Sequence, residues 1–179
     1  MQLTGGFKMA VCALQRGHLG RRSGNTGTPG EVEYNVVISK RVMTKLESEG
    51  IEVWLYGADD VPRGLRCDAF LALHCDGAKS PDANGFSLGY PDHLGDAGEL
   101  ARCLRQSYGA STGIRFRGYN ITRSLRCYYA FSRVKARGRA VIELGFLTNP
   151  SERCYLLENA ELVAEGVADG LLQFLALGK

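Results

Sequence analysis

Four residues whose side chains suit metal-assisted hydrolysis lie far apart in this 179-residue sequence: His18, Glu31, His74 and Glu143. Two histidines and one carboxylate form the ligand set of a catalytic zinc, which keeps a fourth position open for water. A further carboxylate, not bound to the metal, is then needed to carry a proton from that water to a leaving amine. The pattern therefore favours a Zn²⁺ site built from the first three residues, with Glu143 as the catalytic carboxylate.

Each of these residues also has an explanation that involves no catalysis. A histidine at the end of a strand is more often structural, and a glutamate at the start of a helix is favoured by the helix dipole. Glu143 is harder to explain in this way, because it interrupts the apolar run "VIELGF" and a buried carboxylate is costly without a partner. Spacing alone leaves both explanations open.

The elements that would position these residues follow from the apolar pattern. Short apolar runs predict buried strands over 7–15, 51–56, 67–75, 85–91 and 139–149. Apolar residues at three- and four-residue steps predict helices over 31–50, 95–108 and 160–177, and a further helix starts near Asn149-Pro150-Ser151. Residues 114–138 are rich in Arg and Tyr and show no clear period.

This order of elements indicates an α/β fold in a single domain over residues 1–179. Nearly continuous apolar strands that alternate with helices are typical of a twisted, mostly parallel sheet with helices on both faces. The carboxyl ends of such strands share one edge, where functional sites form. We therefore expect His18, His74 and Glu143 at that edge, and the glycines of the loop over 16–30 let Glu31 fold back toward them.

Composition excludes several other classes of protein. The net charge of +3 is too weakly basic to indicate nucleic-acid binding, although it is compatible with an anionic polymer. No apolar run approaches the ~18–20 residues of a membrane span, and the N-terminal apolar stretch is too short for a signal-peptide core. We therefore expect no membrane span and synthesis in the cytoplasm. The six cysteines show no CxxC pair and are expected to be reduced, small buried residues.

Four stretches of the sequence, which together extend over residues 9–175, resemble one enzyme family. They are "GHLGRRSGNTGTPGE", "EVEYN", "DAFLALHCDGA" and "AVIELGFLTNPSE". In order and spacing they are similar to the Gly-His-Gly, Glu-x-x-x-Asn, Asp-x-x-x-Ser-x-His-x-Asn-Ala and Glu-x-Gly-Phe-x-Ser/Thr-Asn motifs of the zinc-dependent N-acetylmuramoyl-L-alanine amidases. That family includes bacterial cell-wall amidases and phage endolysins.

The resemblance implies zinc ligation by His18, Glu31 and His74, with Glu143 as the catalytic carboxylate. Glu31 is chosen over Glu33 because only Glu31 has the Glu-x-x-x-Asn spacing to Asn35. The chain departs from the family pattern in two places. Asp76 replaces the usual asparagine after the second histidine. The link between the second and third predicted strands is shorter than the long helix of many members, which predicts a more open site.

The resemblance also implies a substrate and a setting. The expected reaction is hydrolysis of the amide between N-acetylmuramic acid and L-alanine in bacterial peptidoglycan. With no signal peptide and no added wall-binding module, the expected setting is a monomeric phage or prophage endolysin that accumulates in the cytoplasm and acts on the wall after release. A catalytic domain cut from a longer chain is an equal alternative. Two alternatives stay open: a zinc peptidase-like hydrolase that cleaves within wall peptides, and a degenerate protein that only binds peptidoglycan.

Other residues near these motifs carry weaker signals. Cys75 is discounted as a ligand because adjacent strand residues point to opposite faces, and His93 lies in a loop typical of a surface. The segment 115–133 either lines the substrate groove, where Arg would recognise carboxylates, or forms a solvated basic face. The Arg21-Arg22 pair faces either the wall polymer or water.

Overall fold

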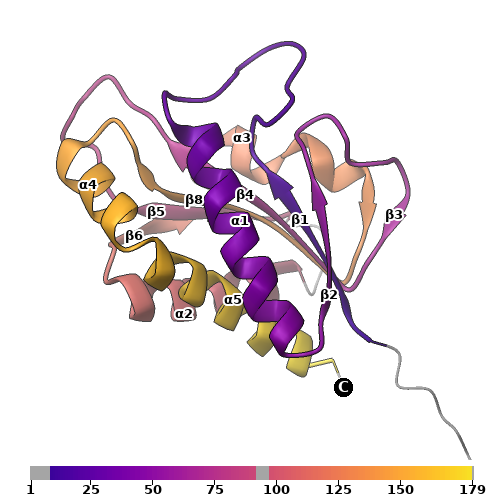
Figure 1. Ribbon diagram of the computed structural model, residues 1–179. Coiled ribbons are helices and arrows are strands. Elements are labelled where there is room, and N and C mark those ends of the chain that lie inside the picture. The colour runs from indigo at the N-terminus through magenta and orange to yellow at the C-terminus, as the bar shows by residue number, and fades with distance from the viewer. Residues whose placement is uncertain (1–8, 92–96, 179) are drawn as a thin grey trace, which may run out of the picture.

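The structure, a computed structural model, describes residues 9–91 and 97–178 and centres on one six-stranded sheet (Figure 1). In spatial order the strands are β2 (Glu52–Tyr56), β1 (Val11–Arg16), β4 (Ala69–Asp76), β8 (Gly138–Phe146), β5 (Phe86–Gly89) and β6 (Phe116–Tyr119). The first four are mutually parallel, whereas β5 pairs antiparallel with β8 and parallel with β6. The predicted mostly parallel sheet is confirmed, with one reversal that the apolar pattern does not reveal.

One face of the sheet is covered by helices α1 (Glu31–Ser48), α2 (Ala97–Thr112), α4 (Pro150–Glu158) and α5 (Ala160–Ala176) (Figure 1). The main core lies in this layer, where Leu14 and Leu71 of the strands pack with Ile38 of α1 and Leu171 of α5. All four side chains are fully buried, and burying each stabilises the fold by roughly 1.5–3 kcal/mol.

The opposite face carries a thinner layer made from two separate segments of the chain, one between β2 and β4 and the other between β6 and β8. It consists of a two-stranded sheet of β3 (Leu65–Arg66) and β7 (Val134–Lys135), the short helix α3 (Arg123–Arg126) and a 3₁₀ turn at Tyr129–Ser132. Phe70 and Val141 of the main sheet pack against this layer. Coverage of both faces is therefore confirmed, and the segment 114–138, which has no clear sequence period, contains β6, α3, the 3₁₀ turn and β7.

The strands read as continuous apolar runs because alternate residues serve the two layers. In β1, Cys12 and Leu14 face the helical core while Ala13 faces the thinner layer. The six cysteines are free thiols, as expected, but the expectation that they are buried is wrong for Cys127 and Cys154, which are exposed. His93 lies outside the described residues.

The two ends of the described chain lie at the same edge of the sheet. β1 begins at Val11 and runs toward His18, so Val11 lies at the edge away from His18. The end of α5 lies beside the amino end of β8, where Arg137 Nη2 donates to the Phe174 carbonyl at 2.6 Å. Within 9–91 and 97–178, no helix is long and apolar enough to cross a membrane.

Candidate active site

His18 follows β1 in a tight turn and has a left-handed backbone, with φ of 59°. Its Nδ1 lies 2.8 Å from the carbonyl oxygen of Asn25. Since a carbonyl only accepts, Nδ1 carries the proton and donates, and Nε2 is left with its lone pair. That Nε2 lies 3.4 Å from Glu31 Oε1.

Glu31 is the first residue of α1 and is only 2% exposed. Two backbone amides hold its carboxylate: Thr28 N donates to Oε2 at 2.9 Å and Cys75 N to Oε1 at 3.1 Å. Burial raises the pKa of Glu31, whereas the two backbone N–H groups that donate to its carboxylate lower the pKa and favour the ionised form. Glu31 is therefore a buried carboxylate held by two backbone donors.

His74 lies near the carboxyl end of β4 and is 7% exposed. Its Nδ1 lies 3.1 Å from Glu31 Oε1, and its Nε2 lies 2.8 Å from the hydroxyl of Tyr128. Burial lowers the pKa of His74, and the opposing contact with Glu31 does not cancel this effect. The ring is therefore neutral, which is the form that binds metals.

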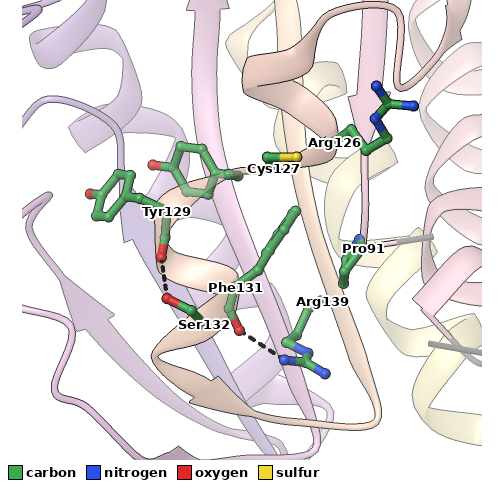
Figure 2. Close-up of a pocket in the computed structure, with 8 residues that line it drawn as sticks. Pro91, Arg126, Cys127, Tyr129, Phe131, Ser132 and Arg139 are labelled. Carbon is green, nitrogen blue, oxygen red and sulfur yellow. Dashed lines mark hydrogen bonds between the residues drawn. The ribbon is translucent and has the colours of Figure 1, made fainter. Parts of the chain in front are cut away.

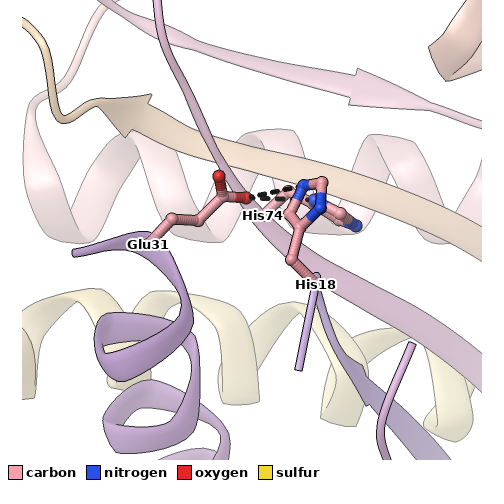
Figure 3. A group of neighbouring side chains, drawn as sticks. All are labelled: His18, Glu31 and His74. Atoms are coloured by element: carbon pink, nitrogen blue, oxygen red, sulfur yellow. Dashed lines mark hydrogen bonds and ion pairs between the residues drawn. The ribbon is translucent and has the colours of Figure 1, made fainter. Parts of the chain in front are cut away.

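These three side chains converge as the sequence predicts (Figure 3). One ligand atom from each lies within 4.8 Å of the other two. The separations of 3.4 and 3.1 Å from Glu31 Oε1 resemble the roughly 3.3 Å between ligands of a tetrahedral ion bound at about 2.0–2.1 Å. Two imidazoles and a carboxylate at these spacings fit a zinc ion.

Glu143 lies on β8 directly opposite His74 in the parallel register, so both side chains belong to the same face of the sheet. It lines a pocket of about 500 Å³ together with His18, Glu31 and His74. Its Oε2 is buried and has no hydrogen-bond partner among the residues that the structure describes. Burial raises the pKa of Glu143 well above its ordinary value, and the negative charges of Asp76 and Glu31 add to this effect.

Asp76, which stands where the family pattern has asparagine, forms an ion pair with Arg117 at 2.8 Å. The guanidinium of Arg117 also stacks over the ring of Phe146, 4.6 Å from its centroid. Burial raises the pKa of Asp76 despite this pairing. At Arg117, then, the Arg- and Tyr-rich segment 115–133 contacts a residue of the pocket wall rather than only solvent.

Asn35 explains why the spacing from Glu31 matters. Four residues apart on a helix, the two side chains share one face. Asn35 Nδ2 lies 3.5 Å from the Gly17 carbonyl and so connects α1 to the turn that carries His18. Gly17 must be small, because a Cβ there would lie 2.5 Å from the Leu73 carbonyl and 2.6 Å from the His74 ring.

Cys75 takes no part in the ligand cluster. Its sulfur lies in the helical core, 3.9 Å from Asn35 Oδ1, and only its backbone amide contacts Glu31. This placement agrees with the expected alternation along β4.

The Arg21-Arg22 pair contacts the protein itself. Arg21 Nη1 lies 3.5 Å from Asp59 and its guanidinium stacks over Tyr129, while the backbone amide of Arg22 donates to Asp59 at 3.0 Å. Arg21 is thus held against the protein, whereas the side chain of Arg22 is 79% exposed to solvent. Contact of either residue with the wall polymer stays a prediction.

A second hollow lies on the other side of the histidines, and its wall is a residue that the sequence did not single out. This cavity of about 230 Å³ is lined by His18, His74, Tyr128 and their neighbours. It shares Cys127, Tyr128 and Tyr129 with a pocket of about 630 Å³ that extends to Arg139 (Figure 2). Tyr128 lies in the segment without a period, 54 residues from His74 and directly before the 3₁₀ turn, so no pattern in the sequence marks it.

Two imidazoles and a carboxylate meet at the carboxyl-end edge of an open α/β sheet, with a further carboxylate on the neighbouring strand, an arrangement typical of metal-dependent hydrolases. A family model described as N-acetylmuramoyl-L-alanine amidase matches residues 12–173. The chain therefore belongs to the N-acetylmuramoyl-L-alanine amidase family, as the motifs predict.

Individual relatives agree with this assignment. The chain is 25% identical over 151 residues to the probable cell wall amidase LytH of Staphylococcus aureus, which covers 79% of this chain and 48% of LytH. The chain thus spans about half the length of the curated relatives it matches.

Solved amidase structures share the fold. The catalytic domain of CwlV from Bacillus (Paenibacillus) polymyxa var. colistinus superposes with a TM-score of 0.72 and 22% identity, covering 94% of this chain and 99% of that domain. Ami1 of Mycobacterium smegmatis gives 0.75 and 20% identity, with 94% and 97% covered. These likenesses confirm the predicted α/β architecture.

Proposed function

We propose that this chain is a zinc-dependent hydrolase that cleaves the amide between N-acetylmuramic acid and L-alanine in peptidoglycan. The observation that carries the proposal is the convergence of His18, Glu31 and His74 on a common point, with Glu143 on the neighbouring strand. Family membership supports the choice of substrate.

His18, Glu31 and His74 would hold the ion. The hydrogen bonds that each of these side chains makes to its other neighbours would keep that side chain in place. A bound zinc ion supplies Lewis-acid polarisation of the scissile carbonyl and lowers the pKa of water. Glu143, with one oxygen free of hydrogen bonds, accepts a proton from the attacking water as the new carbon–oxygen bond forms. It then gives this proton to the alanine nitrogen as the carbon–nitrogen bond breaks.

The pocket suits a polymeric substrate. It is an open hollow of about 500 Å³ at the sheet edge, bordered by Lys79 and Thr148 as well as the cluster. The hollow that continues past Tyr128 toward Arg139 gives a glycopeptide room on the other side of the histidines.

Glu143→Gln tests the role of the catalytic carboxylate. The amide has nearly the same shape but cannot accept the water's proton, so the variant should bind zinc at the wild-type stoichiometry and lose at least about a hundredfold in turnover. Metal analysis and release of soluble wall fragments measure the two properties. Retained hydrolysis would contradict the role of Glu143.

Mass analysis of digested wall separates this function from its rivals. An amidase leaves intact glycan and stem peptides with a free alanine amine, whereas a peptidase leaves cleaved peptides. A protein that only binds peptidoglycan releases neither product. The digestion should stop when a chelator is added and resume when zinc is returned in excess.

The lytic setting stays a prediction: an endolysin made in the cytoplasm, monomeric in solution, that acts on the wall after release. Fractionation of producing cells before and after lysis measures the location. Light scattering of the purified chain measures its oligomeric state.

A further inference from the structure

We propose that Tyr128 is a positioning residue that selects the tautomer of His74 and so keeps His74 Nδ1 available to a metal ion. The proposal rests on the proposed zinc function. The Tyr128 hydroxyl comes from the thinner layer of the fold and contacts the His74 ring at Nε2, whereas Glu31 lies beside Nδ1. The hydroxyl oxygen lies 2.8 Å from His74 Nε2 and 2.7 Å from Gln15 Oε1.

The direction of each hydrogen bond follows from the orientation of the Gln15 amide. Gln15 Nε2 donates to the Ala58 carbonyl at 3.0 Å and to the Tyr129 hydroxyl at 2.8 Å. The Tyr129 hydroxyl in turn donates to the same Ala58 carbonyl. Both protons of the Gln15 amide are therefore engaged, and its oxygen must face Tyr128. Gln15 is fully buried, so water does not offer an alternative partner.

The single proton of the Tyr128 hydroxyl is thereby committed. Gln15 Oε1 is only an acceptor, so Tyr128 donates its proton to that oxygen. The hydroxyl can then only accept from His74, which requires the imidazole proton to lie on Nε2. The lone pair of His74 is left on Nδ1, which lies 3.1 Å from Glu31 Oε1.

Without Tyr128 the opposite tautomer has the advantage. A proton on Nδ1 would donate directly to the Glu31 carboxylate at the existing distance of 3.1 Å. That hydrogen bond would pair His74 Nδ1 with the Glu31 carboxylate, and a protonated Nδ1 has no lone pair to offer a cation. The Tyr128–Gln15 relay thus opposes a hydrogen bond that the two ligands would otherwise make with each other. Fixing the tautomer is the general role of outer partners of metal-binding histidines.

Tyr128→Phe isolates the hydroxyl from the ring. The ring contacts with His74, Tyr129 and Phe131, at centroid distances of 5.4, 4.8 and 5.6 Å, are available to phenylalanine as well. The matched control is Tyr155→Phe, which removes a hydroxyl that donates to the Thr112 carbonyl at 2.6 Å, away from the site.

The experiment has two readouts on the full chain, and neither depends on activity. Zinc affinity is measured by competition with a chromophoric chelator at fixed pH. The position of the His74 ring proton is read from ¹⁵N chemical shifts of the zinc-free protein, in which only three histidines need assignment. We expect zinc affinity to fall by roughly ten- to a hundredfold in Tyr128→Phe, and the His74 proton to move from Nε2 to Nδ1. Tyr155→Phe should match the wild type in both.

A second variant approaches the relay from its other end. In Gln15→Leu the acceptor is gone and Tyr128 becomes free to donate to His74 Nε2, so zinc affinity should again fall. Combined with Tyr128→Phe, it should add little to the loss caused by Tyr128→Phe alone, because both changes act through one hydrogen bond. Fully additive losses would overturn the relay.

The outcomes separate this proposal from the proposed function. Wild-type zinc affinity together with a His74 proton still on Nε2 in Tyr128→Phe would overturn the positioning role and leave the amidase function standing. A proton shift in Tyr128→Phe, combined with a wild-type chain that does not cleave peptidoglycan, would support the positioning role and overturn the function.

Discussion

A single carboxylate oxygen, Glu31 Oε1, is the meeting point of the site. It lies 3.4 Å from His18 Nε2 and 3.1 Å from His74 Nδ1, and it also accepts from the Cys75 amide. The other oxygen accepts from the Thr28 amide. Two backbone N–H groups and two imidazole nitrogens surround this carboxylate, and together they fix its orientation.

Glu31→Gln should therefore fail in either orientation of the new amide. Whichever way the amide lies, its NH₂ group faces one of the two backbone N–H donors, which costs roughly 1–3 kcal/mol for the unsatisfied group. Loss of the negative charge also removes the anionic ligand. We expect a folded protein, by circular dichroism, that retains less than about a tenth of the wild-type zinc affinity.

Glu33→Gln is the natural control for this substitution, because Glu33 is exposed on the same helix turn. It should leave zinc affinity unchanged. If the two variants bound zinc equally well, Glu31 would not be a ligand.

At the scale of elements, the site depends on how closely the loop over 17–30 folds against α1. Gly27 has φ of 89°, and a Cβ there would lie 2.7 Å from Glu31 Oε2 and 3.0 Å from His18 Cδ2. Gly24 has a similar φ of 83° in the same loop, but a Cβ there meets nothing within 4 Å. The two glycines thus share a backbone conformation and differ in what surrounds them.

This pair gives a matched test of the loop. Gly27→Ala and Gly24→Ala should both lose about 1–2 kcal/mol of stability from the left-handed backbone. Only Gly27→Ala should also displace the carboxylate and the imidazole, and so weaken zinc binding and wall hydrolysis several-fold. Equal zinc affinity in the two variants, measured by chelator competition, would show that the loop tolerates the added methyl group.

The helices and strands differ in how well the local sequence pattern predicts them. Strands such as β1, β4 and β8 were predictable because burial on both faces leaves a continuous run of apolar residues. Amphipathic helices such as α1 were predictable because burial of one face leaves a periodic pattern. The segment 114–138 was not, since its elements span two to four residues each. Elements that short display no full period.

The candidate site likewise has one part that the sequence predicts and one part that it does not. The cluster of His18, Glu31 and His74 could be predicted because each residue ends a strand or starts a helix, and parallel strands bring such ends together. The contacts of Tyr128 with His74 and Gln15 could not, because they join residues 54 and 113 positions apart through side chains alone. The antiparallel direction of β5 was hidden for a related reason: a strand's apolar pattern is the same in both directions.

At the scale of the whole molecule, the proposed ion would connect three separate elements. His18 follows β1, Glu31 starts α1 and His74 belongs to β4, so one ligand set joins the first third of the chain to the centre of the sheet. Binding to the folded state alone stabilises that state by mass action.

Zinc removal should therefore lower the unfolding temperature. At free zinc about a hundred times the Kd, the stabilisation is ~2.7 kcal/mol. For a chain of this size that corresponds to a shift of roughly 5–10 °C in Tm. Calorimetry with zinc and with chelator measures the shift, and Glu31→Gln should show little or none. An unchanged wild-type Tm would mean that the ion does not bind these elements together.

Both ends of the described chain leave the sheet at the edge away from His18 (Figure 1). A bead, a surface or another polypeptide attached near Val11 or after α5 would consequently be held on the far side of the molecule. The hollow that contains Glu143 would stay turned outward. Immobilised preparations linked through either end should therefore digest insoluble sacculi at similar rates.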